Sequence, residues 1–524
     1  MIRAITAILS RPALPSTLVA LVGGRSFAIA LASLTFLVAL PVLTVPVPPL
    51  TDFVNHLARM GILADIGTNT ALARTYAIEW AVIPNLIMDV VVPPLVHHLG
   101  LPGAGQVFLT MMVLLLVTGP MAIHRALWGR FSPWPLLAFP LVYNGIFLYG
   151  LVNYLLGVGI ALWGVALWIA LRDRSVARRG LASAIIVLVL FLCHLFAVGL
   201  YGLTLLAFEL WRLAQRRSTW TWRDLAAFAL PFVPVIPLIL ASPTLGLSKM
   251  NLWESHGKLD GLYLTVQLYR DPIDMVFAAI LVGATVWLAK RDLLRLHGAG
   301  WVLLALGGVV FLAMPRQLFG SWIADQRLPV ALVFLTIGFV SPELRGRLSR
   351  GAFYAFIAGL TLARTVEVQA NWLDLADITA DMRAAVGRMP RGATVLVAHA
   401  DEPAGGMVME QALSHAPSWA VIDRDALIST IFAVPGKQVL AIRPEFADLV
   451  DRDDGDPPTV SQLLASVDGP VPGAARFWDA WPGRYDFVYI LYTRPGAANP
   501  DPDHLQPVFE GRGFQLYRTM PDRD

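Results

Sequence analysis

Four polar residues near the start of the chain, Asp52, Asn55, His56 and Arg59, are spaced i, i+3, i+4 and i+7. On a helix they would share one face, and Thr51, which follows a proline pair, is predicted to cap it. A carboxylate one helical turn from a histidine suits general-base chemistry or cation binding. The alternative is an interfacial helix with a solvated polar face, in which Asp52 favours the positive end of the helix dipole.

Three more polar residues interrupt apolar stretches and are candidates for substrate binding. Asp89 lies in the run 86–92, where an acid is costly unless it has a partner. It either faces a substrate or pairs with a structural arginine in a re-entrant or interfacial helix. Asn153 lies at a predicted outer turn, and His194 lies near the outer end of another apolar run. A lone histidine in such a run is more often a hydrogen-bonded core residue than a ligand.

Arg270, Arg316 and Arg327 lie where apolar runs meet polar loops, and Asp271 directly follows the first of them. Guanidinium groups at a membrane boundary can hold a phosphate through two hydrogen bonds. Alternatively, each arginine reaches lipid headgroups or pairs with a neighbouring acid such as Asp271. Three arginines around one cavity would favour phosphate binding.

The elements that must position these residues are membrane helices. The longest stretch without a charged residue, 131–171, is too long for one crossing of roughly 20 residues and is predicted to be a hairpin turning near Gly150. The chain of 524 residues is only 15% charged, whereas soluble chains average about 25%. The fold class is therefore a polytopic α-helical membrane protein, with about eleven spans near 26–48, 104–124, 134–150, 152–171, 181–197, 199–211, 225–241, 275–289, 299–314, 327–341 and 351–368.

Basic residues concentrate in every second loop, at 125–130, 172–179, 212–223, 290–295 and 345–350. This positive-inside pattern predicts a cytoplasmic N-terminus and an outward-facing first loop, 49–103. The pattern requires two short spans within 181–211, meeting near Gly199, rather than one tilted helix. The small net charge of +3 gives no indication of nucleic-acid binding, and the single cysteine, Cys193, excludes an internal disulfide or a cysteine metal cluster.

The composition changes near residue 371, where acidic residues and turn-rich sequence begin. Residues 1–370 are predicted to form the transmembrane domain and 371–524 an independently folding, soluble α/β domain outside the cytoplasm. Its strands are expected near 393–398, 419–422, 438–442, 487–492 and 514–517.

The chain contains no HExxH, phosphate-loop, GxSxG or dinucleotide-binding motif. Its layout, with Asp52 just beyond the first span, a helical first outer loop and a C-terminal outer domain, resembles the GT-C superfamily of integral-membrane glycosyltransferases. The resemblance implies sugar transfer from a polyprenyl-phosphate donor to a glycan, lipid or protein acceptor in a bacterial inner membrane. It also implies an inverting reaction with Asp52 as general base, and arginines on the leaving lipid phosphate.

A second acidic motif cannot be aligned, so Asp271 and Asp89 are both candidates for its place. Some members of the superfamily use a divalent cation and others do not, so metal use stays open. Two rival functions also stay open: a transporter or lipid flippase gated by Asp52 and His56, and a non-catalytic envelope assembly protein.

Overall fold

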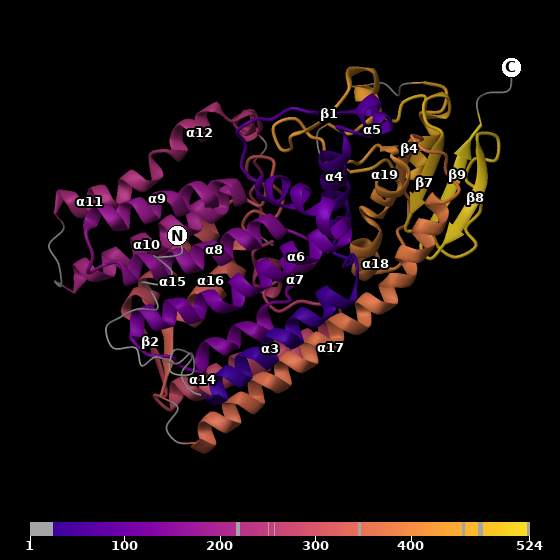
Figure 1. Cartoon of the computed structure of the whole chain (residues 1–524). Coiled ribbons are helices and arrows are strands. Elements are labelled where there is room, and N and C mark those ends of the chain that lie inside the picture. The colour runs from indigo at the N-terminus through magenta and orange to yellow at the C-terminus, as the bar shows by residue number, and fades with distance from the viewer. Residues whose placement is uncertain are drawn as a thin grey trace.

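The computed structural model describes residues 25–215, 221–249, 251–255, 257–343, 347–452, 456–469 and 475–520. The predicted cytoplasmic segment 1–24 and parts of the basic loops 212–223 and 345–350 lie outside these residues. A bundle of helices makes up most of the molecule, and a sheet stands at one end beyond the long helix α17 (Figure 1). The chain is thus a polytopic helical protein with a strand-containing C-terminal region.

Eight apolar helical segments in the described part of the chain are long enough to cross a membrane. They are α3 (Arg25–Thr44), α6 (Ile87–Trp128, kinked at Gly100), α8 (Val152–Ala170), α9 (Val176–Cys193), α10 (Leu195–Ala214), the Trp222–Ala241 segment with α11 (Trp222–Ala229), η2 (Leu230–Phe232) and α12 (Val235–Ala241), α14 (Asp271–Lys290) and α17 (Arg347–Val386). Two shorter apolar helices accompany them, α15 (Gly298–Ala313) and α16 (Arg327–Phe339).

The structure differs from the predicted spans most clearly at 134–150 and within 181–211. Residues 134–150 form the short 3-10 helix η1 (Trp134–Leu141) and the single turn α7 (Gly145–Leu148) instead of a spanning helix. Pro133, Pro135 and Pro140 explain the difference, because proline lacks the amide hydrogen that a continuous helix needs. The region 181–211 does form two helices, but they part at His194, whose extended backbone separates α9 from α10, rather than near Gly199.

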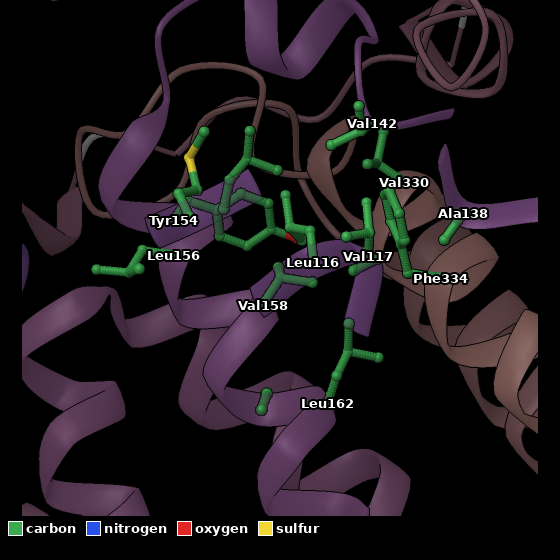
Figure 2. Close-up of a cluster of buried hydrophobic side chains, with 14 of the residues drawn as sticks. Leu116, Val117, Ala138, Val142, Tyr154, Leu156, Val158, Leu162, Val330 and Phe334 are labelled. Atoms are coloured by element: carbon green, nitrogen blue, oxygen red, sulfur yellow. The ribbon is translucent and has the colours of Figure 1, made fainter. Parts of the chain in front are cut away.

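Buried apolar side chains of α6, η1, α8 and α16 form the centre of the bundle (Figure 2). Helices α6 and α8 approach so closely at Gly119 that a Cβ atom there would lie 2.5 Å from the Cβ atom of Leu162. Small residues permit such close packing where apolar surroundings give helices no hydrophobic reason to associate. This core fixes the start of α8 and α16, where several candidate site residues lie.

The C-terminal domain is built on a five-stranded sheet in the order β5-β4-β7-β9-β8. The three strands β5, β4 and β7 are parallel, whereas β9 and β8 complete the sheet in antiparallel fashion. The register pairs Val397 with Tyr489 and Tyr489 with Leu516. The bounds are β4 Thr394–His399, β5 Leu427–Ile428, β7 Phe487–Leu491, β8 Leu505–Gly511 and β9 Phe514–Thr519.

One predicted strand is wrong, since Trp419 to Ile422 belong to the helix α19 (Trp419–Arg424). The preceding 3-10 turn η4 (Ala416–Ser418) leads directly into it, and the helix packs against α4. Tertiary packing therefore outweighs the β preference of its valine and isoleucine. The remaining helices of the domain are α18 (Gly406–Leu413), η5 (Pro444–Leu449), α20 (Val460–Leu464) and η6 (Trp481–Gly483).

The loop 49–103, which we call the first outer loop after its predicted orientation, shares a hydrophobic core with the C-terminal domain. The strand β1 (Tyr76–Ile78) of this loop pairs antiparallel with β6 (Leu440–Ile442) of the domain. Side chains of α4 (Phe53–Asp65), including Ala58 and Ile62, pack in the same cluster as β4 and β7. The other connecting elements are α5 (Thr70–Thr75), η3 (Pro243–Lys249), α13 (Gly257–Tyr263), β2 (Leu294–Leu296) and β3 (Val340–Pro342).

Candidate functional site

Backbone hydrogen bonds to the turn before α8 hold Asp52 in place. Its N–H donates to the carbonyl of Tyr149 over 3.2 Å, and the N–H of Thr51 donates to the carbonyl of Leu148 over 3.0 Å. Gly150, with φ of 78°, permits this approach, because a Cβ atom there would lie 2.9 Å from the nitrogen of Asp52. The helix begins one residue later than expected, so Asp52 rather than Thr51 is the N-cap residue, and its carboxylate makes no capping bond.

The helix α4 is buried between the bundle and the C-terminal domain, so it has no solvated polar face. Asn55 and Arg59 are fully buried, His56 is nearly so, and the Asp52 side chain keeps 25% of its surface exposed. The interfacial alternative therefore does not describe this helix. The reason is the C-terminal domain, whose core includes the other face of α4.

Arg59 and Asp89 bind each other rather than facing a cavity. Arg59 donates from Nε to Oδ1 over 2.8 Å and from Nη2 to Oδ2 over 3.0 Å, and neither side chain is more than 2% exposed. Such a bidentate pair satisfies the buried carboxylate. In this geometry Arg59 is the arginine with which Asp89 pairs, as the structural interpretation expects.

The face of α4 predicted from spacing meets a histidine of the C-terminal domain. Nε2 of His415 lies 3.5 Å from Oδ1 of Asp52, and Nδ1 of the same ring lies 3.2 Å from Nδ2 of Asn55. Both His415 and His56 stack edge-on against Phe432, at centroid distances of 4.8 and 5.2 Å. Asp52, Asn55 and His415 therefore form one polar cluster at the boundary between the two domains.

His56 contributes a neutral ring to this boundary. Burial lowers its pKa well below the usual value, and the positive charge of Arg59 and the nearby His415 add to the effect. Its Nδ1 is buried and makes no hydrogen bond to any residue that the structure describes. His56 therefore packs beside the cluster and does not share the contacts of Asp52.

His194 and Arg327, expected on different grounds, lie together. Nη1 of Arg327 is 3.0 Å from Nε2 of His194, and its Nη2 donates to the carbonyl of Trp322 over 2.7 Å. The hydroxyl of Tyr154 donates to the carbonyl of Arg327 over 2.9 Å. Asn153, one residue earlier, instead donates to Asn85 in the first outer loop, over 2.9 and 3.0 Å.

The three arginines do not all surround one cavity. Arg316 stacks over the ring of Trp322 at 4.9 Å and lies 3.4 Å from Glu254, so it shares the neighbourhood of Trp322 with Arg327. Arg270 is exposed at the start of α14, where its electrostatic partner is Glu367 of α17. Asp271 accepts a hydrogen bond from Tyr263 over 2.7 Å.

A cavity of about 530 Å³ opens beside Arg327. Arg327 is the one charged residue among its lining side chains. The others are mostly apolar and come mainly from α8, α10, η2, α15 and α16 (Tyr154, Leu195, Phe196, Leu203, Phe232, Val310, Leu328). Binding cavities commonly have this form, a largely apolar wall with a few polar groups that fix orientation. The arrangement suits a ligand with an apolar chain and an anionic end.

Asp52 lies close enough to Arg327 for an electrostatic interaction between them. Tyr149 interacts electrostatically with Arg316 and with the carboxylates of Glu410, Asp260 and Asp52. Asp52 thus links this group of charges to Arg327. Nothing in the local sequence singles out Tyr149, Glu410 or His415. Each follows an ordinary turn or helix pattern, and only the docking of the C-terminal domain brings His415 to Asp52 and Glu410 into the neighbourhood of Tyr149.

Asp52 and His415 are the side chains of the cluster that could contact a cation. Within the described part of the chain, no three histidine, cysteine, aspartate or glutamate side chains converge as metal ligands. Asp52 and His415 alone would offer two donors, which is fewer than calcium or zinc sites usually draw from protein. We therefore derive no chemical step through a metal ion.

No protein-family model and no curated protein sequence matches the chain. Among solved structures, the chain is similar to ArnT from Cupriavidus metallidurans, whose crystal structure was determined bound to undecaprenyl phosphate. The TM-score is 0.54 and the identity 12%, and the match covers 94% of this chain and 97% of ArnT. It thus spans the helical bundle, the first outer loop and the C-terminal domain. The chain therefore has the same overall fold as ArnT.

Proposed function

We propose that the protein is a glycosyltransferase that moves a sugar from a polyprenyl-phosphate donor to an acceptor hydroxyl. The observation that carries the proposal is the partly exposed carboxylate of Asp52 in electrostatic range of Arg327, which lines an apolar cavity. The fold shared with ArnT, whose structure holds undecaprenyl phosphate, supports the same donor class.

The donor would bind with its isoprenoid chain against the apolar wall of the cavity. Its phosphate would meet Arg327, whose charge is held at the cavity by His194 and by the carbonyl of Trp322. Arg316, stacked on the same tryptophan, would supply a second positive charge. Negative charge grows on the phosphate as the glycosidic bond breaks, so both groups stabilise the transition state more than the ground state.

Asp52 would act as the general base. An acceptor hydroxyl attacks the anomeric carbon, its proton passes to the Asp52 carboxylate, and the bond from the anomeric carbon to the phosphate oxygen breaks. Attack opposite the leaving phosphate inverts the anomeric configuration. The lack of a capping bond matters here, because it leaves the carboxylate free to accept this proton.

The test of this function is transfer by the purified protein in detergent or liposomes. We expect it to release polyprenyl phosphate from a set of radiolabelled polyprenyl-phosphate sugars only when an acceptor extract of the cell envelope is present. Movement of the labelled lipid across the bilayer without sugar transfer would refute the enzyme and favour a flippase. Neither transfer nor movement would favour an assembly protein.

Replacing Arg327 tests the donor site. We expect Arg327→Ala to lower kcat/KM for the lipid donor by about 10²- to 10³-fold, the usual loss when one charge-stabilising donor is removed. Arg327→Lys should lose less, because it keeps the charge but not the planar fork. The measurements are initial rates and the affinity for free polyprenyl phosphate.

Arg291→Ala is the matched control for Arg327. This exposed arginine follows the C-terminal end of α14 and stacks over Trp287, so its loss should leave donor use unchanged. Normal kcat/KM in Arg327→Ala would show that the phosphate binds elsewhere. An equal loss in Arg291→Ala would show a general effect of removing positive charge.

We further propose that the site faces the outside of a bacterial inner membrane. The basic loops at 125–130, 172–179 and 290–295 support this orientation, because positive charge favours the cytoplasmic side. Reporter fusions after the C-terminal domain should therefore be active only outside the cytoplasm. A cytoplasmic-type signal would reverse the orientation and place Asp52 on the inner side.

A further inference from the structure

The hydrogen bonds of Asn55 determine which atom of its amide faces His415. Oδ1 of Asn55 accepts from the N–H of Phe432 over 3.0 Å, and Nδ2 donates to the carbonyl of Thr430 over 2.8 Å. If the amide were flipped, its NH₂ group would face the N–H of Phe432 and its oxygen would face the carbonyl oxygen of Thr430. The amide atom that faces His415 is therefore the nitrogen, Nδ2. Its second hydrogen points to Nδ1 of His415, and the two nitrogens are 3.2 Å apart.

This contact fixes the tautomer of His415. An Nδ1 that accepts a hydrogen bond carries no proton, so in the neutral ring the proton is on Nε2. Nε2 is the atom that lies 3.5 Å from Oδ1 of Asp52. A hydrogen bond of catalytic groups is often long in the absence of substrate and shortens in the complex. The ring therefore presents a donor to the carboxylate.

We propose that His415 is a positioning residue, whose Nε2–H holds Oδ1 of Asp52 so that Oδ2 faces the acceptor hydroxyl; this role rests on the function proposed above. Aspartate is among the residues that most often cap their own helix, yet Asp52 makes no such bond at the start of α4. Without His415 the carboxylate is free to turn toward the N–H groups of the first helical turn, away from the acceptor.

The proposal gives the C-terminal domain a part in the chemistry. His415 precedes η4, and the neighbouring Phe432 packs against both His415 and His56. Asn55 and Asp52 belong to the first outer loop, so the chain Asn55–His415–Asp52 crosses the domain boundary twice. Correct docking of the domain is then a condition for the correct orientation of the base.

A matched pair of substitutions tests the role of Nε2. The amide nitrogen of glutamine reaches the position of Nε2 in histidine, whereas the asparagine amide reaches only that of Nδ1. We expect His415→Asn to lower kcat by at least about tenfold with KM for the donor unchanged, within the range that a general base supplies. His415→Gln should restore most of the rate. Because His415 is partly exposed, both variants should keep the wild-type melting temperature.

The outcomes separate this proposal from the proposed function. If wild-type protein transfers sugar and both variants match it, or both lose the same activity, the role of Nε2 is refuted. If wild-type protein transfers nothing, the proposed function fails, and the contact itself is judged by ¹⁵N NMR of histidine-labelled protein. There, a His415 signal with the proton on Nε2 that shifts in Asp52→Asn supports the contact, and a proton on Nδ1 overturns it.

Discussion

Asp52→Asn is expected to lower sugar transfer by about 10²- to 10⁴-fold, the contribution of a general base. The amide keeps the size of the carboxylate but cannot take the proton of the acceptor hydroxyl. Asparagine caps helices as well as aspartate does, so α4 should lose no stability. The measurements are kcat with a saturating donor and the melting temperature of the same purified variant.

Asp65→Asn is the control for this substitution. It makes the same chemical change at the exposed far end of the same helix, and its turnover should equal that of wild type. Full turnover in Asp52→Asn would leave Asp52 as a residue of the helix end only. Loss of activity together with loss of folding would give the general-base role no support.

Asp89→Ala is expected to destabilise the protein by about 3–5 kcal/mol, because it leaves the buried guanidinium of Arg59 without its partner. Both side chains are at most 2% exposed, so water cannot replace the lost carboxylate. The measurement is thermal unfolding in detergent. Per folded molecule, turnover should stay close to wild type at low temperature, since Arg59 lies about two helical turns from the partly exposed carboxylate of Asp52.

Two further variants test whether the loss of stability comes from the unpaired buried charge. Replacing both partners by apolar residues of similar size, Arg59→Met with Asp89→Leu, should recover most of the stability, because no charge is then left unpaired. Asp423→Ala breaks the more exposed pair with Arg383 and should cost at most about 1 kcal/mol. A stable Asp89→Ala variant that fails to use its substrate would instead support the role of Asp89 in binding.

Much of the fold follows from the sequence because the bilayer restricts the choice of structure. Long apolar runs such as 152–171 have to be helices, since no other single segment satisfies its own backbone in lipid. Hydropathy alone does not reveal that prolines interrupt 134–150, or that extended backbone at His194 separates α9 from α10. In the C-terminal domain, the apolar segment of α19 has no period that distinguishes a short strand from a helical turn.

The candidate site is predictable only in part, for a related reason. Asp52 and Arg327 are identifiable because charged residues at the edges of apolar runs are few and costly. The partners that orient them come from elsewhere in the chain: His194 for Arg327, and His415 for Asp52. His415 lies in an ordinary turn of the C-terminal domain, and nothing in its local sequence indicates that it meets the first outer loop.

The pairing of β1 with β6 has a consequence for how the chain acquires its structure during synthesis. The first outer loop is made early, but its strand partner, Leu440–Ile442, is made only after all the membrane helices. Closing so long a loop costs little more in stability than closing a shorter one, yet contacts distant in sequence form slowly. Until then Val54, Ala58 and Ile62 lack the core that buries them. The newly made loop is therefore the segment most in need of protection from aggregation and proteolysis before the last third of the chain arrives.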